Sequence, residues 1–280
     1  MKKISRRSFL AAAGLSVAAL ALTACGGSSA STASSVASSA ASSEAASTSA
    51  AAGELATVEA GKLTMATNAA FPPYEMTTDA GEFEGIDIET AQAIADKLGL
   101  ELQIDDMDFD AALLSVQQGK ADIVMAGVTV TDERKAVMDF SDSYATGIQS
   151  IIVPEGSDIA SPDDLAGKKI GTQRGTTGYI YCSDDFGDDN VVAYDDGLTA
   201  VQALNNGQVD AVVIDNAPAQ EFIAANPGLK ILDTAYAQED YAIGVAKGNT
   251  ELLNAINGAL EELQADGTLQ SIVDKYIKAE

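Results

Sequence analysis

The residues best suited to bind an ion lie in the stretch 126–135, where an apolar run gives way to polar residues. The run 123–126 predicts a short buried strand that ends at Gly127. Thr131 is a favourable helix N-cap, and Arg134 follows in the first turn of the predicted helix. The free N–H groups of a helix start and the planar guanidinium of an arginine both bind carboxylates. This stretch therefore predicts a carboxylate site.

A matching acidic residue, Asp215, follows the corresponding strand in a second copy of the same pattern. The stretch 118–127 aligns with 206–215, so Gly127 and Asp215 occupy equivalent positions at strand ends. Ligands of open α/β sheets bind at such ends. One end offers N–H groups and the Arg134 cation, and the other offers an anion. A molecule that carries a carboxylate and an ammonium on one carbon would fit between them.

Both charged residues also have a plainer interpretation. Arg134 could be a surface arginine that pairs with Asp132 or Asp139. Asp215 could simply cap the helix that begins before Ala217. Because the two residues stand at equivalent strand ends, we favour a shared ligand over two unrelated structural roles.

The elements that would position these residues alternate between strand and helix in two passes. For the first pass the pattern predicts strands at 62–67, 100–104 and 123–126, and helices at 91–98 and 109–116. For the second pass it predicts strands at 168–173, 191–194 and 210–214, and helices near 179–181 and at 198–204. Such alternation implies right-handed crossovers and a mostly parallel sheet in each half.

The first 24 residues predict export. A basic start is followed by an apolar run over residues 11–24, which fits a secretory signal peptide and is too short to span a bilayer. The pair Arg6-Arg7 resembles a twin-arginine export signal, although an ordinary signal can begin in a similar way. Residues 22–25 resemble a bacterial lipobox, which would make Cys25 the lipidated first residue of the mature chain. The Ser-, Ala- and Thr-rich residues 25–53 then form a flexible tether.

The net charge limits the partners that the folded body can bind, and the cysteine content limits the disulfides that it can form. The chain has 16 basic and 42 acidic residues, and four of the basic ones lie in the signal peptide, which leaves 12 against 42 and a net charge of −30 in the mature chain. This excess disfavours binding of nucleic acid or of anionic lipid through the folded body, so we expect membrane contact through the lipid anchor only. After Cys25 only Cys182 remains, so no disulfide forms within the mature chain.

Several motifs occur in one order between residue 63 and about residue 277. They are the stretches 67–75 (TNAAFPPYE), 107–110 (MDFD), 126–135 (AGVTVTDERK), 139–142 (DFSD), 175–178 (GTTG), 210–216 (DAVVIDN) and 265–268 (ADGT). Together they resemble an extracellular solute-binding protein of the polar amino-acid ABC importer family (family 3), the group that contains the glutamine- and histidine-binding proteins. The resemblance implies an α/β fold, a two-lobed clamshell of the periplasmic-binding-protein type (type II), with a cleft between the lobes. Two hinge strands would lie near 147–153 and 239–245.

The resemblance also implies domain limits and a set of ligand-facing residues. Lobe 1 would comprise residues 54–148 and 240–280, and lobe 2 residues 149–239. Phe71 and Phe109 would sandwich the ligand's side chain, although both could be ordinary core residues. The residues that would hold the ligand's carboxylate are Gly127, Thr129, Arg134 and Thr177, and Asp215 would hold its ammonium. The residues that would face the ligand from the second lobe are Gln173 and Thr176.

Asn68 departs from the family pattern in a way that bears on the ligand. Relatives often carry an acid there, and in binders of basic amino acids this charge helps to meet the ligand's cation. An amide at this position, together with Gln173, favours a neutral polar side chain on the ligand. Glu75 and Asp87 could still supply a negative charge, or could serve a structural role.

The expected function is that of a receptor and not of an enzyme. We expect a lipid-anchored monomer without cofactor or metal, exported to the outer face of the cell membrane or to the periplasm. It would capture a free L-amino acid and deliver it to the permease subunits of an ABC importer. The chain also resembles the cyclohexadienyl dehydratases, with a carboxyl such as Glu75 as an acid, but it has no histidine and no G-x-S-x-G motif. A third alternative is a sensor domain, which would need a separate signalling partner.

Overall fold

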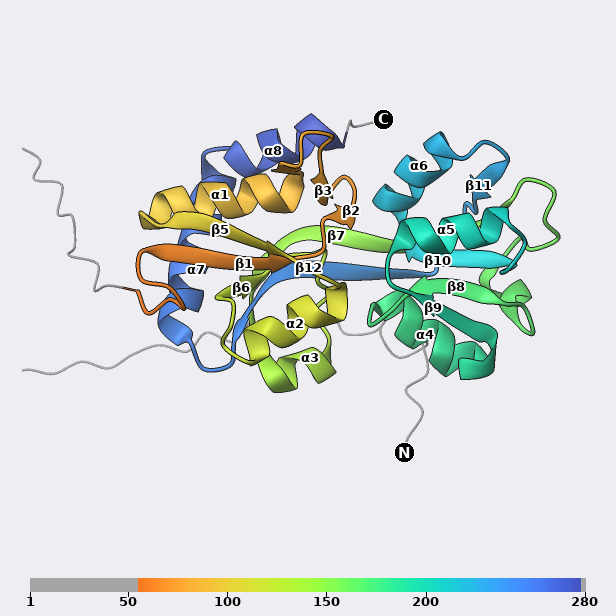
Figure 1. Ribbon diagram of the computed structural model, residues 1–280, viewed down its shortest axis with the longest axis horizontal. Helices are drawn as coiled ribbons and strands as arrows, with labels where there is room; N and C mark the ends of the chain where they lie inside the picture. The colour runs from red at the N-terminus through yellow and green to blue at the C-terminus, as the bar shows by residue number, and fades with distance from the viewer. Residues whose placement is uncertain (1–54, 278–280) are drawn as a thin grey trace, which may run out of the picture. The chain divides into compact units, whose positions relative to one another are not determined.

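The computed structural model describes residues 55–277. The predicted signal peptide (1–24), Cys25 and the tether up to residue 53 lie outside the described residues. Within the described range, the strands form a mixed sheet of nine strands and a small sheet of three (Figure 1). The strand order of the large sheet is β5-β1-β6-β12-β7-β10-β8-β9, and β11 pairs with β7.

Two groups of parallel strands make up the two ends of the large sheet. The strands of the first group are β1 (Lys62–Thr67), β5 (Glu101–Asp106) and β6 (Ile123–Val124). Those of the second group are β8 (Ile170–Gln173), β9 (Val191–Tyr194) and β10 (Ala211–Asp215). β1 pairs in parallel with both β5 and β6, and β8 with both β9 and β10. Parallel neighbours need crossover connections, which the helices between them supply.

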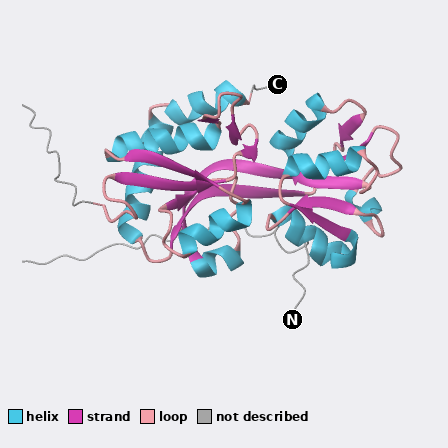
Figure 2. Cartoon of the chain, viewed as in Figure 1, coloured by secondary structure: helices cyan, strands magenta, loops and turns pink. Residues whose placement is uncertain are grey.

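Helices cover both faces of each strand group (Figure 2). They are α1 (Ile86–Leu98), α2 (Phe109–Gln117), α3 (Asp132–Val137), α4 (Thr177–Phe186), α5 (Gly197–Asn205), α6 (Asn216–Ala225), α7 (Thr250–Ala265) and α8 (Thr268–Tyr276). Because successive side chains of a strand point to opposite faces, β1 sends Leu63 and Met65 into one apolar core and Ala66 into another. Both faces of the strands are therefore buried, as is usual for parallel sheets.

Two long antiparallel strands, β7 (Met138–Pro154) and β12 (Ala237–Ala246), join the two groups. β12 also pairs with β6 of the first group, and β7 with β10 of the second and with the short β11 (Leu229–Ile231). The predicted hinge segments 147–153 and 239–245 lie within these strands. The fold is thus the α/β two-lobed clamshell that the resemblance implies, whereas the residue limits of the two lobes stay a prediction.

The small sheet lies in the first half of the described chain and leads into α1. Its strands are β2 (Ala70–Phe71), β3 (Glu75–Thr77) and β4 (Phe83–Glu84). α1 ends at Gly99, whose left-handed φ of 69° a glycine adopts without steric cost. The chain after β12 returns to the first group, since α7 packs on α1 and Lys97 bonds Glu262 at 3.0 Å.

Side-chain caps fix the starts of three helices beside the strand ends. The Thr131 hydroxyl accepts the Arg134 N–H at 3.2 Å before α3, and the Thr176 hydroxyl accepts an N–H of the first turn of α4. Asp215 accepts the Ala217 N–H at 3.0 Å before α6. A cap satisfies an N–H that has no partner within the helix. Each of these three capping bonds therefore holds the start of a helix in place beside the end of a strand.

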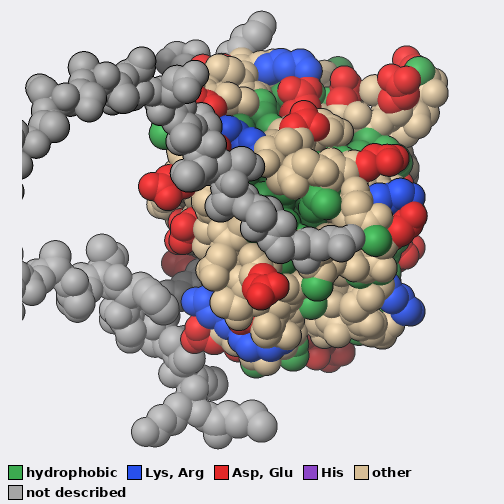
Figure 3. Space-filling view, turned by 90° about the vertical axis from the view of Figure 1, so that its left-hand side faces the viewer, with side chains coloured by type: hydrophobic (Ala, Val, Ile, Leu, Met, Phe, Trp, Pro, Cys, Tyr) green, Lys and Arg blue, Asp and Glu red, His purple; other side chains and the backbone are tan. Residues whose placement is uncertain are grey.

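One face of the molecule shows how charged side chains are distributed on it. On the face shown in Figure 3, acidic side chains are spread among those of Lys and Arg. Of the helices within residues 55–277, none is long and apolar enough to cross a bilayer.

Candidate functional site

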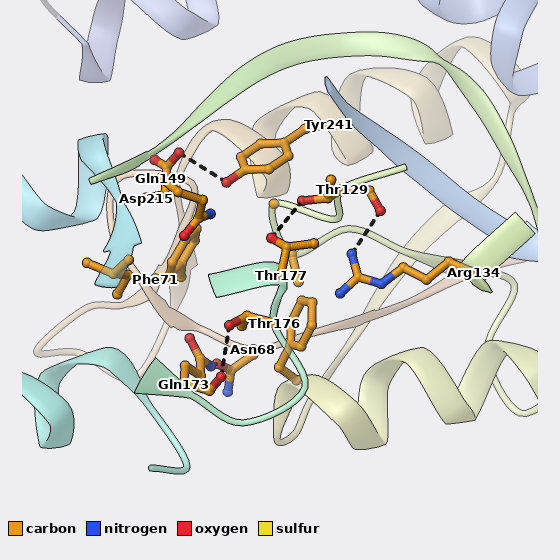
Figure 4. A pocket seen from close by; sticks show the side chains of 14 residues that line it. Asn68, Phe71, Thr129, Arg134, Gln149, Gln173, Thr176, Thr177, Asp215 and Tyr241 are labelled. Atoms are coloured by element: carbon orange, nitrogen blue, oxygen red, sulfur yellow. Dashed lines mark hydrogen bonds between the residues drawn. The ribbon is translucent and has the colours of Figure 1, made fainter. Parts of the chain in front are cut away.

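All ten residues predicted to face a ligand line one pocket, where strand ends of both groups meet β7 and β12 (Figure 4). They are Asn68, Phe71, Phe109, Gly127, Thr129, Arg134, Gln173, Thr176, Thr177 and Asp215. The other lining residues are Ala126, Gln149, Ile214 and Tyr241. The side chains fill most of this space in the present conformation and leave a cavity of about 20 Å³.

Arg134 is buried at one side of the pocket, with only 8% of its surface exposed. Its Nη1 donates to the Thr129 carbonyl at 2.8 Å and its Nη2 to the Gly175 carbonyl at 3.1 Å, and the guanidinium lies 5.3 Å from the centre of the Phe109 ring. Burial lowers the pKa of the guanidinium, and the nearby Glu239 carboxylate acts in the opposite direction. A guanidinium has five N–H donors, so two carbonyls orient it without exhausting it.

The alternative interpretation of Arg134 as a surface residue is wrong. Its burial separates it from the exposed acids at the start of α3. Asp139, one of its two suggested partners, instead accepts from Lys247 at 2.7 Å and from the Gly248 N–H at 2.7 Å.

Asp215 lies on the opposite side of the pocket from Arg134 (Figure 4) and is 1% exposed. Its carboxylate accepts the Ala217 N–H at 3.0 Å, the Ile148 N–H at 2.7 Å and the Tyr241 hydroxyl at 3.1 Å. Burial raises the pKa of Asp215 to about 6, although the two N–H groups act against this rise. The helix-cap interpretation is therefore correct, and it coexists with a position on the pocket wall.

Glu239 is a buried acid beside the pocket that the sequence did not reveal. One of its oxygens, Oε2, accepts the Thr177 hydroxyl at 2.9 Å, the Thr129 hydroxyl at 3.1 Å and the Gln149 amide at 3.0 Å. These three donors come from both strand groups and from β7. The only signal in the sequence is the alternation of Glu239 with Tyr241 along β12, which places both side chains on one face.

Gly127 lines the pocket, but its N–H is directed elsewhere. The N–H donates to Asp87 Oδ2 at 3.0 Å, and the role of Gly127 toward a ligand's carboxylate stays a prediction. Gly127 has a φ of 55°, and a Cβ on it would come within 2.9 Å of the Phe71 ring and 3.3 Å of the Tyr241 ring. A glycine is therefore required here both for its backbone conformation and for the close packing.

Phe71 and Phe109 are core residues that also form part of the pocket wall. Phe71 and Phe109 line the pocket and are 9% and 5% exposed, and each belongs to a hydrophobic core cluster. Phe71 stacks on Tyr74 with ring centres 5.8 Å apart. Tyr74 in turn meets the edge of Tyr241 at 5.5 Å. The rings are thus held rigidly at the pocket wall.

Two buried amides meet across the pocket at its other end. Gln173 Nε2 donates to Asn68 Oδ1 at 2.8 Å, and Asn68 Nδ2 donates to the Met107 carbonyl at 2.9 Å. Asn68 follows β1 and Gln173 ends β8, so this bond links the two strand groups. Thr176 supports Gln173 by donating its hydroxyl to the Gln173 carbonyl at 2.8 Å.

Comparison of the chain with known proteins identifies its family. Residues 63–279 match the family described as bacterial extracellular solute-binding proteins, family 3. The L-cystine-binding protein TcyJ of Escherichia coli (strain K12) is 34% identical over 226 residues, which cover 79% of this chain and 85% of TcyJ.

Two solved structures of an ancestral arginine-binding protein are also similar. The structure bound to glutamine is 43% identical with a TM-score of 0.75, and covers 79% of this chain and 100% of its own. The structure bound to arginine is 44% identical with a TM-score of 0.73, and covers 78% of this chain and 98% of its own. Other relatives are described as binding proteins for arginine and glutamine that belong to ABC transporters. The chain therefore belongs to family 3 of the bacterial extracellular solute-binding proteins.

Proposed function

We propose that this protein captures a free L-amino acid between its two lobes and delivers it to the permease subunits of an ABC importer. The observation that carries the proposal is the placement of Arg134 and Asp215, a buried cation and a buried anion, on opposite sides of one pocket. A zwitterion satisfies both charges at once. Closure of the lobes over it would be stabilised by contacts to both sides.

The carboxylate of the ligand would bind Arg134 and the first N–H groups of α4, where Thr177 begins the helix. Helix starts attract anions, and the guanidinium supplies a planar pair of donors. The Thr129 and Thr177 hydroxyls already donate to Glu239, so they would serve the ligand only by leaving that acid. Asp215 would take the ammonium.

The side chain of the ligand would lie between Phe71 and Phe109 and end at the Asn68–Gln173 amide pair. Because amides both donate and accept, this end favours a neutral polar side chain such as that of glutamine. The ancestral arginine-binding protein was solved with glutamine as well as with arginine. The scaffold is thus compatible with either type of side chain, and we propose the neutral polar type for this chain.

We further propose an exported, lipid-anchored monomer. Residues 1–24 would be removed as a signal peptide, Cys25 would carry the lipid, and residues 25–53 would be the tether. Lobe 1 would comprise residues 54–148 and 240–280, and lobe 2 residues 149–239. In this role the protein would need no catalytic reaction, cofactor or metal.

Isothermal titration of the folded, ligand-free protein with a panel of amino acids tests the proposal. The panel contains glutamine, arginine, histidine and cystine, and we expect one site with the tightest binding for glutamine. Tighter binding of arginine would overturn the side-chain preference alone, whereas no binding of any member would overturn the function. Turnover of prephenate or arogenate would instead support a dehydratase.

A further inference from the structure

Two buried carboxyl groups adjoin the pocket wall at Gly127. Glu75, the first residue of β3, and Asp87, in the first turn of α1, are both 0% exposed. Asp87 Oδ2 accepts the Gly127 N–H at 3.0 Å and the Tyr144 hydroxyl at 2.8 Å. Asp87 is therefore the direct support of a residue that lines the pocket.

Three oxygens of this pair have no N–H or O–H partner among the described residues. They are Oε1 and Oε2 of Glu75 and Oδ1 of Asp87, all shielded from solvent. The backbone places the two residues side by side, because the Asp87 N–H donates to the carbonyl of Tyr74, the neighbour of Glu75, at 2.8 Å. The two carboxyl groups therefore lie next to each other in the same buried space and interact. Since carboxylates only accept hydrogen bonds, a bond between them requires one proton. Without it, two unpaired charges would be buried, which is far more costly than burying one neutral acid.

Burial and the carboxylates that face Glu75 oppose its ionisation, whereas the phenols near it are neutral. The carboxylates are Asp87, Asp106 and Asp215, and the phenols are Tyr74 and Tyr144. Burial, and after it the Asp87 charge, raises the pKa of Glu75 well above its usual range. Burial also raises the pKa of Asp87 to about 6, while the Gly127 N–H and the Tyr144 hydroxyl favour its charged form. Glu75 is therefore the member of the pair that carries the proton.

We propose that Glu75 is a positioning residue: a neutral acid that donates its proton to Asp87 and thereby holds the Gly127 segment of the pocket in place. The effect on binding rests on the function proposed above, because the position of Gly127 matters only to a pocket that takes a ligand. Loss of the proton would leave two buried carboxylates side by side. Their repulsion would move Asp87 and, with it, the Gly127 backbone that packs against Phe71.

The shared proton makes folding and binding depend on pH in the same direction. The unfolded chain releases the Glu75 proton near the usual glutamic acid pKa of about 4.3, whereas the native protein keeps it. Because the native state then binds more protons than the unfolded state, the free energy of unfolding falls as pH rises, until the native pair also releases its proton. Affinity for the ligand falls in the pH range in which the native pair loses its proton, because both carboxyl groups are then charged.

Substitution Glu75→Gln tests the proposal, because glutamine keeps an N–H donor for Asp87 but cannot titrate. Infrared difference spectra near neutral pH are expected to show the C=O stretch of a protonated carboxyl in the wild type and not in Glu75→Gln. Titrations with the amino acid that the wild type binds are then repeated at rising pH. We expect the wild type to lose about fivefold or more in affinity, the lower end of typical couplings between sites, and Glu75→Gln to lose only what deprotonation of the ligand itself causes.

The matched control is Glu82→Gln, an exposed acid in the turn between β3 and β4, which is expected to behave as the wild type does. Absence of the infrared band, or equal pH profiles for wild type and Glu75→Gln, would overturn the proposal. If Glu75→Gln does not fold, Asp87→Asn provides the test. The C=O stretch of the protonated Glu75 must then shift in frequency, because the substitution changes its hydrogen-bond partner. If no amino acid binds, the proposed function fails, and the infrared and unfolding data still decide on the shared proton.

Discussion

At the scale of single residues, Arg134 and Asp215 each hold part of the fold together as well as facing the pocket. Arg134 donates to two carbonyls, and Asp215 accepts from two backbone N–H groups and from Tyr241. These bonds fix the orientation of both charged groups. Groups that are already oriented lose less conformational freedom on binding, which favours affinity.

Replacing Arg134 with lysine is expected to weaken amino-acid binding by about 10- to 100-fold. The reason is that lysine cannot present a planar pair of donors, and a hydrogen bond to a charged group is worth roughly 1.5–3 kcal/mol. Isothermal titration measures the change. The matched control is Arg174→Lys, an exposed arginine 3.5 Å from Asp195, which should bind as the wild type does. Equal losses in both variants would contradict the role of Arg134.

Asp215 predicts a second pH effect, of opposite sign to that of Glu75. Because burial raises the pKa of Asp215 to about 6, a growing share of ligand-free protein is protonated there as pH falls below that value. Affinity for a ligand with an ammonium group should therefore drop by up to about tenfold between about pH 7 and pH 5. Titrations at both pH values measure this. Asp215→Asn should bind weakly at both, and a flat wild-type profile would refute the assignment.

The residues of the pocket could be predicted from the sequence where their immediate neighbours in the chain mark a strand end or a helix start. Gly127 and Asp215 follow buried strands, and Thr176 begins a helix, so each could be placed from the neighbouring sequence. Glu239 has no such signal, because its partners Thr129, Gln149 and Thr177 lie far from it in the sequence and meet it only in the folded protein. The bond from the Gly127 N–H to Asp87 could not be predicted for the same reason, since Asp87 belongs to a different element.

At the scale of elements, β7 and β12 are packed tightly where they pass the pocket. Tyr241 on β12 is 1% exposed, and its ring lies against Gly147 on β7. A Cβ on Gly147 would come within 2.3 Å of Tyr241 Cζ and 2.5 Å of its hydroxyl oxygen. The contact leaves no room for a side chain, so the pairing of the two strands depends on this glycine.

Gly147→Ala is therefore expected to destabilise the protein by about 1–3 kcal/mol, the usual range for overpacking. It should also weaken ligand binding, because a displaced Tyr241 no longer donates to Asp215. Urea unfolding and isothermal titration measure the two effects. Gly156→Ala serves as the control, since a Cβ there meets no atom within 4 Å. An unchanged unfolding midpoint for Gly147→Ala would show that the ring can move at no cost.

Periodicity predicted the interiors of the elements better than their ends. The bounds of β1 and β9 are those predicted, 62–67 and 191–194. β6 ends two residues earlier than predicted, where the chain leaves the sheet toward the turn at Gly127. α4 continues to Phe186, well past the predicted 179–181, because hydrogen bonds extend the helix through polar residues that show no apolar period.

At the scale of the whole molecule, contacts between the two strand groups surround the pocket. Gln173 bonds Asn68, Arg134 bonds the Gly175 carbonyl, and Glu239 receives a hydroxyl from each group. These contacts involve the same side chains that would bind a ligand. Ligand binding and the docking of the lobes should therefore be coupled.

The stability of the whole protein is expected to fall as pH rises from about 5 to about 8. Glu75, Asp87 and Asp215 have raised pKa values, so the native state holds protons that the unfolded chain has released. Repulsion within the acidic surface adds to this trend. Urea unfolding at both pH values, with and without high salt, separates the two causes, because salt screens exposed charges and not buried ones. If salt abolished the whole trend, the buried acids would not be its source.

The three hydrogen bonds that Asp215 accepts have a consequence for how occupancy could be communicated. They tie the start of α6, the backbone of β7 and the ring of a tyrosine on β12 to one carboxylate. A carboxylate has about four lone-pair sites, so an ammonium group could add a fourth bond to a carboxylate that a helix and both crossing strands already share. Occupancy at this one carboxylate would thus be felt at the start of α6 and in both strands that join the two groups.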